Sequence, residues 1–155
     1  MKTWTALFTL ASVIALPVPA MAQLTEEDAT DAVRGPQAVF RLIAHSNRPL
    51  GEMLRGRRDF DLDVLVKGSR RVAMLAGMIP EMFETDTRGH SGLETRASSL
   101  IWDGKDNFLD IAAMLEEGAT KAVEILQTQG EDGLREAADG ITRNCSACHD
   151  NYRLP

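Results

Sequence analysis

Near the C-terminus the chain contains the segment Cys145-Ser146-Ala147-Cys148-His149, which restricts its architecture more than any other and is followed by six residues. These two cysteines are the only ones in the chain, and the histidine is one of three. On a helix, residues three and four apart share a face, so both thiols and the imidazole would lie together. The order C-x-x-C-H is typical of c-type haem attachment, in which thiols bond the porphyrin vinyl groups and histidine ligates iron. The segment therefore predicts haem c anchored by Cys145 and Cys148, with His149 as the proximal ligand. We call it the haem segment.

Three other uses of a C-x-x-C pair explain the segment less well. A thioredoxin-like dithiol stands at the head of a helix that follows a strand, and no βαβ pattern precedes this pair. A structural zinc site needs four ligands, whereas the chain has no second cysteine pair. A disulfide across two intervening residues closes too short a loop to stabilise the chain much.

The N-terminal segment has the pattern of an export signal. Lys2 precedes a mainly apolar run over residues 6–16, two prolines follow, and an A-x-A cleavage site ends at Ala22. The apolar run is too short for a transmembrane helix. We expect residues 1–22 to be a cleaved secretory signal peptide, and residues 23–155 to be a periplasmic domain that is not held in the membrane.

The composition restricts the partners of this domain. The chain has 17 basic and 23 acidic residues, and removing the signal would take one cation and no acid, which leaves a net charge of −7. Nucleic-acid binding needs clustered Lys and Arg, so an acidic domain argues against nucleic acid as a partner. Negative charge is compatible with a basic redox partner protein.

Apolar residues recur at helical spacing from residue 25 to the haem segment, and no stretch has convincing strand periodicity. The expected helices run over about 25–55, from Asp61 or Asp63 to Pro80, over about 103–128, and over about 132–152. Amphipathic helices with short connections predict an all-α fold, an antiparallel four-helix bundle with the haem between helices.

Single residues predict where these helices are interrupted or begin. Pro36 and Pro49 should cause a kink or a restart in the first helix, because proline removes a backbone hydrogen bond and clashes with the previous turn. Asp103 is expected to cap the third helix. The segment 84–95 is expected to be a surface loop with His90 in solvent.

The methionines of the second helix allow two interpretations. Met74, Met78 and Met82 recur every four residues, and one of them could supply a thioether ligand to the iron. Methionine is more often a flexible filler of the core, so we expect these side chains inside the bundle. The apolar stripes of the first and third helices are likewise expected to bury Leu42 and Met114.

The sixth ligand of the iron decides between functions. No Met, His or Lys follows His149, so a second ligand would have to come from upstream, most simply from the first helix. That helix offers Phe40 and Ile43, whereas Met53 lies about 20 Å beyond Phe40 and His45 is turned away from it by about 140°. We therefore expect a five-coordinate iron and an apolar distal pocket that admits small diatomic gases.

Arg153 follows His149 by four residues and lies one turn further along the same face. Its cation could lie against the proximal imidazole or a porphyrin edge. It could equally be an arginine near a helix C-terminus, where positive charge is favourable. Both interpretations remain open from the residues alone.

The chain resembles the cytochromes c′ over essentially all of residues 23–155. The resemblance implies an exported, usually dimeric four-helix bundle with pentacoordinate haem c, which binds nitric oxide and carbon monoxide and serves nitric oxide tolerance or electron transfer. It also implies that Phe40 covers the distal haem face and that Arg153 belongs to the proximal pocket. The segments that carry the likeness are 145–153 (CSACHDNYR), Asp31-Ala32-Val33, Ile101-Trp102 and Pro80–Phe83.

The chain departs from the family pattern on its first helix. Members commonly carry an arginine four residues before the distal apolar residue, near a haem propionate, and here that position is Pro36. Arg34 or Arg41 could take over this contact. The candidate haem-binding residues are Cys145, Cys148, His149, Phe40, Arg153, Phe83 and Ile43.

The favoured function is gas binding rather than enzymatic turnover, because no polar distal acid or base of the peroxidase kind is evident. The alternative is a low-spin electron-transfer cytochrome, in which Met53, Met78 or Met82 reaches the iron. A helical bundle with a spare dithiol is a third, non-haem possibility. The resemblance also implies a homodimer, for which exposed apolar positions on the first two helices are the expected interface.

Overall fold

The computed structural model describes residues 24–90 and 92–155, so the expected signal peptide lies outside the described residues. Within this part of the chain the backbone forms helices and one isolated antiparallel bridge, between Ala97 and Arg153, but no strand. The helices are α1 (Glu26–Leu54), α2 (Leu62–Gly77), α3 (Ile79–Met82), α4 (Leu100–Asp103), α5 (Lys105–Gln129) and α6 (Leu134–Tyr152), with the 3₁₀ turn η1 (Gly130–Gly133) before α6.

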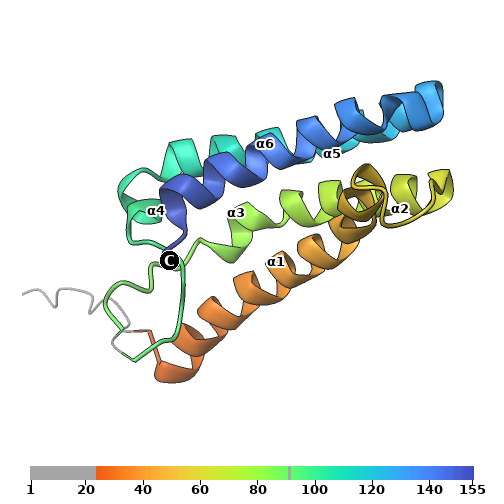
Figure 1. The fold of residues 1–155 in the computed structure, drawn as a ribbon. Coiled ribbons are helices and arrows are strands. Elements are labelled where there is room, and N and C mark those ends of the chain that lie inside the picture. The colour runs from red at the N-terminus through yellow and green to blue at the C-terminus, as the bar shows by residue number, and fades with distance from the viewer. Residues whose placement is uncertain (1–23, 91) are drawn as a thin grey trace, which may run out of the picture.

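The four long helices form the antiparallel bundle predicted from the sequence. α2 packs against both α1 and α5, and α5 packs against α6. α1 contacts α6 much less, and the two helices diverge toward the N-terminal end of α1 and the C-terminal end of α6 (Figure 1). The bundle is therefore closed along α2 and α5 and opens where the haem segment ends.

α1 is continuous, so the helix does not restart at either proline, and a kink, the other expectation, stays a prediction. The helix passes through Pro36 and Pro49, although an interior proline costs about 3 kcal/mol. Gly35 precedes Pro36 and has no Cβ, which relieves the clash that disfavours helical backbone before a proline. Packing of the buried side of α1 against α2 offsets the remaining cost.

The start of α2 and the break after it depend on particular side chains. Asp61, and not Asp63, caps α2, because its carboxylate accepts a 3.0 Å hydrogen bond from the Val64 amide. α2 ends at Gly77, before the predicted end at Pro80. Pro80 instead lies in the first turn of α3, where the missing amide costs no hydrogen bond.

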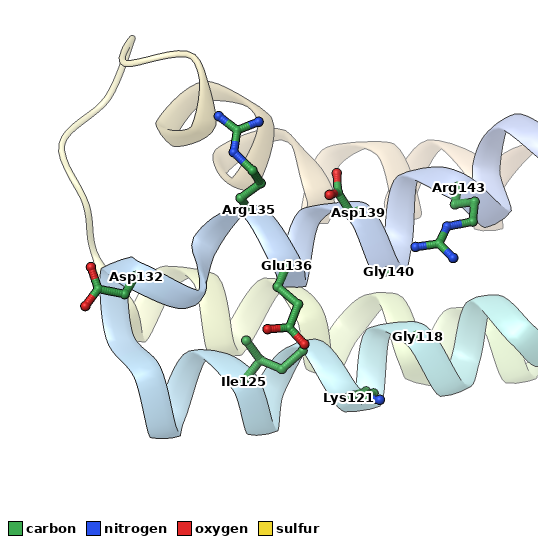
Figure 2. Close-up of a pocket in the computed structure, with 9 residues that line it drawn as sticks. All are labelled: Gly118, Lys121, Ile125, Asp132, Arg135, Glu136, Asp139, Gly140 and Arg143. Atoms are coloured by element: carbon green, nitrogen blue, oxygen red, sulfur yellow. The ribbon is translucent and has the colours of Figure 1, made fainter.

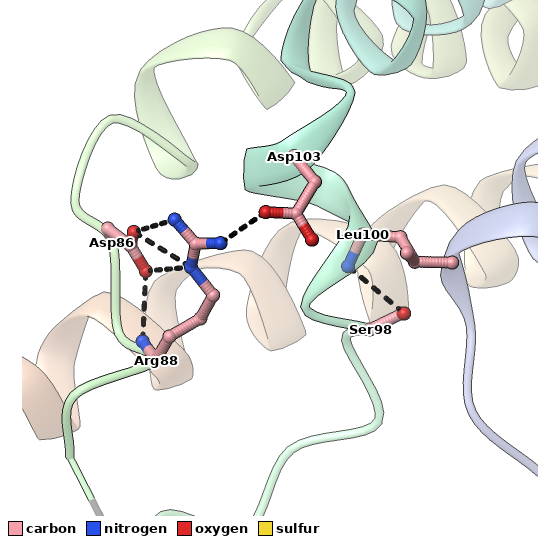
Figure 3. A network of polar contacts seen from close by, with 5 residues as sticks. All are labelled: Asp86, Arg88, Ser98, Leu100 and Asp103. Atoms are coloured by element: carbon pink, nitrogen blue, oxygen red, sulfur yellow. Dashed lines mark hydrogen bonds and ion pairs between the residues drawn. The ribbon is translucent and has the colours of Figure 1, made fainter.

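Asp103 does not cap the third long helix, contrary to the prediction. α5 begins after Gly104, and Asp103 ends the separate short helix α4. Its carboxylate accepts a hydrogen bond from the guanidinium of Arg88, which also binds Asp86 (Figure 3). This pairing lowers the pKa of Asp86, mainly through the hydrogen bond from Arg88. The loop between α3 and α4, expected at the surface, is thus held to α4 by this ion pair.

Three apolar side chains that we expected in the core are exposed: Leu42 by 53%, Met74 by 65% and Met114 by 46%. Leu42 and Met114 lie at the edges of the buried sides of α1 and α5, whereas Met74 lies on the side of α2 opposite to its buried residues. His45 is exposed, whereas His90 is half-buried and not in solvent as expected. None of the helices in the described ranges is long and apolar enough to cross a membrane.

α6 lies unusually close to α5 where two glycines face each other. A Cβ on Gly118 would lie 2.5 Å from the carbonyl oxygen of Gly140, so only glycine fits at this crossing. Asn144 bridges the same two helices, since its Nδ2 donates to the Met114 and Gly140 carbonyls at 2.9 Å each. This contact immediately precedes Cys145 and fixes the position of the haem segment.

Candidate cofactor site

A cavity of about 530 Å³ lies between α1 and the C-terminal end of α6. Its remaining walls come from the loop between α3 and α4, from α4, and from the start of α5. The volume is within the usual range of small-molecule and cofactor pockets. Figure 1 shows that this is the end of the bundle at which α1 and α6 diverge.

The wall formed by α6 carries the end of the C-x-x-C-H segment. Cys148, His149 and Tyr152 line the cavity, and Tyr152 lies beside both of the others because it follows them by four and three residues on the helix. Cys145 lies one turn earlier and packs half-buried against the core, outside the lining of the cavity. Arg153, just beyond the helix, also lines the cavity.

The electrostatics of this wall favour the neutral form of each group. Burial raises the pKa of the Cys145 thiol, and burial together with the neighbouring Cys145 raises the pKa of Cys148 to about 11. Burial and the nearby Arg153 cation lower the pKa of His149. A neutral imidazole is the form that ligates a metal, so the environment of His149 suits an iron ligand.

Five aromatic side chains, Phe40, Phe83, Trp102, Phe108 and Tyr152, line the cavity and form what we call the aromatic wall. Phe83 is central to it, with its ring centroid 4.9 Å from Phe108 and 6.2 Å from Phe40. Phe108 in turn meets Tyr152 edge to face at 5.3 Å. The wall thus joins α1 to α6 and gives the cavity a large apolar surface suited to a flat apolar ligand.

The loop before α4 is hydrogen-bonded to the end of α6 and closes the cavity on that side. The Ser98 amide donates to the Tyr152 carbonyl at 2.9 Å, and the Leu154 amide donates to the Arg96 carbonyl at 2.7 Å. The Tyr152 hydroxyl also accepts a 2.7 Å hydrogen bond from Asn107 Nδ2 at the start of α5. The haem segment is therefore held at both ends, by the glycine crossing and by this loop.

The side chains expected on the distal side differ in where they lie. Phe40 lines the cavity from α1 and is half-buried, and Phe83 lines it from the residue after α3. Ile43 points elsewhere, since it is buried in the core and is not part of the cavity lining. No methionine and no second histidine occurs in that lining within the described residues. Met82 packs beside α1 instead, with its sulfur 3.3 Å from where a Gly35 Cβ would lie.

Several lining residues were not singled out as site residues from the sequence. Tyr152 follows Cys148 by four residues, so helical spacing alone could have placed it beside the thiol. Phe108 lies on the buried side of α5, but its position in the cavity depends on how α5 meets α6. Thr87 and Arg96 belong to an irregular loop, for which no periodic signal exists.

The residues of the cavity fit a covalently bound porphyrin. The Cys148 thiol and the His149 imidazole line one edge, the Cys145 thiol lies one turn earlier on α6, and the aromatic wall provides the apolar surface. The Trp102 Nε1–H is buried and has no hydrogen-bond partner in the described part of the chain. Since an unpaired buried donor is costly, a bound group with acceptor oxygens would improve this site.

A second hollow, of about 450 Å³, lies over α5, η1 and α6 and does not fit such a group (Figure 2). It contains neither a thiol nor an imidazole, and its charged side chains are exposed. These side chains are Lys121, Asp132, Arg135, Glu136, Asp139 and Arg143.

Comparison with known proteins gives a consistent result. The family described as Cytochrome C′ matches residues 31–153 of the chain. The cytochrome c′ of Rhodopseudomonas palustris is 30% identical over 124 residues, which are 80% of this chain and 82% of that protein. Cytochrome c-554 of Cereibacter sphaeroides is 28% identical over 139 residues, or 88% of each chain.

Solved structures share the same fold. A cytochrome c′ structure from Rhodopseudomonas palustris has a TM-score of 0.75 at 29% identity and covers 81% of this chain and 98% of its own. A ferrous variant of the Alcaligenes xylosoxidans cytochrome c′ with bound nitric oxide has a TM-score of 0.71 and covers 82% and 96% of the two chains. At 20% identity this second likeness concerns the fold alone.

Proposed function

The chain belongs to the cytochrome c′ family and binds haem c covalently through its two cysteines, and from this premise we propose that it is an exported gas-binding protein. In this proposal His149 is the only side-chain ligand of the iron, and the opposite face of the haem is open to nitric oxide or carbon monoxide. Electron exchange with a redox partner protein accompanies gas binding.

The composition of the α1 wall carries the proposal. The side chains that α1 contributes to the cavity include Phe40, Pro36 and Val33, and they include no thioether, imidazole or carboxyl group. Without such a group the chain supplies neither a sixth ligand from this helix nor a distal acid or base for peroxidase-type turnover. The low-spin His/Met alternative would require Met82 to leave its contact with Gly35, Met78 to leave its packing against the core, or Met53 to leave the core.

Three residues of this chain would have separate roles in binding the haem and the gas. His149 holds the iron from α6, and Arg153 lies against the same end of the cavity. When bound, the ferrous haem supplies the site at which diatomic gases bind. Phe40 limits the room for a ligand on the α1 side. The nitric oxide complexes solved for the Alcaligenes xylosoxidans cytochrome c′ support this assignment by analogy.

The optical and resonance Raman spectra of the reduced protein test the proposal. We expect a high-spin, five-coordinate ferrous haem that changes spectrum on addition of nitric oxide. A Met82→Leu variant should have the same resting spectrum, because Met82 is not a ligand in this proposal. A low-spin resting spectrum that becomes high-spin in Met82→Leu would favour the alternative.

The mass of the same sample tests export. It should equal that of residues 23–155 plus one haem, and a protein that retains residues 1–22 would contradict export.

We also propose a homodimer through α1 and α2, where Leu42 and Met74 are exposed by 53% and 65%. Replacing both with glutamate should shift the protein from dimer to monomer in analytical ultracentrifugation, because charges replace apolar surface at the interface. Met114→Glu on α5 is the matched control, since Met114 is also exposed and lies outside α1 and α2. A wild-type monomer at all concentrations would refute the dimer.

A further inference from the structure

Three arginines from separate parts of the chain line the cofactor cavity: Arg41 from α1, Arg96 from the loop before α4, and Arg153 from the residue after α6. Their clustering is unexpected, because the chain as a whole has a net charge of −6. Like charges around one cavity repel each other, and a bound anion would relieve this repulsion.

These arginines have no carboxylate to neutralise them within the described ranges. The ion pairs found there all involve Arg88, which binds Asp86 and Asp103 outside the cavity lining (Figure 3). The other arginines of the described residues also have no carboxylate partner, so what distinguishes Arg41, Arg96 and Arg153 is their common position at the cavity. Because these three line one cavity, their guanidinium groups can act together on one anionic ligand.

Arg41 and Arg96 are positioned by contacts that leave most of their donors free. Arg41 Nη2 donates to Gln37 Oε1 at 3.4 Å, and Gln37 Nε2 donates to the Glu94 carbonyl at 3.0 Å. Arg96, two residues further along, donates from Nε to the Leu154 carbonyl at 3.2 Å. A guanidinium has five N–H donors, so each side chain can still bind a carboxylate. Gln37 connects the Arg41 side of α1 to the loop that carries Arg96.

We propose that Arg41 and Arg96 together hold the haem propionates, an inference that rests on the proposed haem function. The thioethers fix the vinyl edge of the porphyrin to α6, so its two carboxylates lie at a different edge and need cationic partners from other elements. Arg41 and Arg96 are such partners, one on α1 and one on the loop. Arg34 is exposed on α1 and does not line the cavity, so it is not the substitute for an arginine at Pro36.

Resonance Raman spectra of the haem-loaded protein test this assignment, because the propionate bending bands respond to hydrogen bonds at the carboxylates. We expect shifted bands in Arg41→Gln and in Arg96→Gln, and a larger shift in the double variant. The midpoint potential should also fall, since losing positive charge beside the haem favours the ferric state. Arg34→Gln is the matched control and should leave both readouts unchanged. Unshifted bands in the double variant would overturn the proposal.

A double lysine variant and a phosphate titration separate propionate binding from a general charge effect and from binding of a free anion. Arg41→Lys with Arg96→Lys retains the charges but not the bidentate geometry, so it should restore the potential more than the Raman bands. The two arginines could instead bind a free anion. In that case added inorganic phosphate would change the wild-type spectrum, and the double variant would not respond to phosphate. Its propionate bands would be the same as in the wild type. This result would also overturn the proposal. Carbon monoxide binding in the same samples reports on the gas-binding function separately.

Discussion

Replacing Phe40 with alanine is expected to speed carbon monoxide binding to the ferrous protein by about 100-fold, which corresponds to roughly 2.7 kcal/mol of activation free energy. Phe40 is the aromatic side chain that α1 contributes to the cavity. In the proposed site an incoming gas must displace its ring, which packs toward Phe83 at a centroid distance of 6.2 Å. Displacing a packed side chain typically costs about 1–3 kcal/mol, which is of the size required. Flash photolysis or stopped-flow mixing with carbon monoxide measures the rate.

Phe60→Ala is the matched control for this prediction. It removes the same ring from a side chain that packs against the core but does not line the cavity. Its binding rate should remain within a small factor of the wild-type rate. Equal rates in Phe40→Ala and wild type would mean that steric closure by Phe40 does not govern access.

Changing both cysteines to serine should abolish covalent haem attachment. Cys145 and Cys148 are the only thiols in the chain, and a hydroxyl does not form the thioether with a vinyl group. The variant should also unfold at a lower temperature, because the aromatic wall would then surround a cavity of about 530 Å³ without its ligand. Haem staining of a denaturing gel measures attachment, and circular dichroism measures the thermal midpoint.

The neighbouring Ser146 provides the control for the cysteine variants. It is exposed and lies between the two thiols, so Ser146→Ala should bind haem and unfold as the wild type does. Either single cysteine variant should retain one covalent bond to the haem. A double variant that still carries haem through denaturation would show that another side chain forms the attachment.

Local chemistry explains why so much of the fold was predictable. Helical periodicity predicted the four long helices, and regular helix continues through Cys145, Cys148 and His149 to Tyr152. Arg153 follows the helix in extended backbone, so its place in the cavity lining does not come from helical spacing. Cap prediction was less reliable. Asp61 caps α2 by accepting a hydrogen bond from the Val64 amide, whereas the Asp103 carboxylate accepts one from Arg88 in the loop before α4.

The sequence by itself determined the all-α class and the covalent haem anchor, because both depend on spacing within one helix. Tertiary structure alone decided which side chains meet around the cavity. The aromatic wall and the arginine pair Arg41 and Arg96 combine residues from elements far apart in the chain. Ile43, which was expected in the haem site, is buried in the core instead. Such contacts depend on the angle at which α1 diverges from α6, and no periodicity within a single helix encodes that angle.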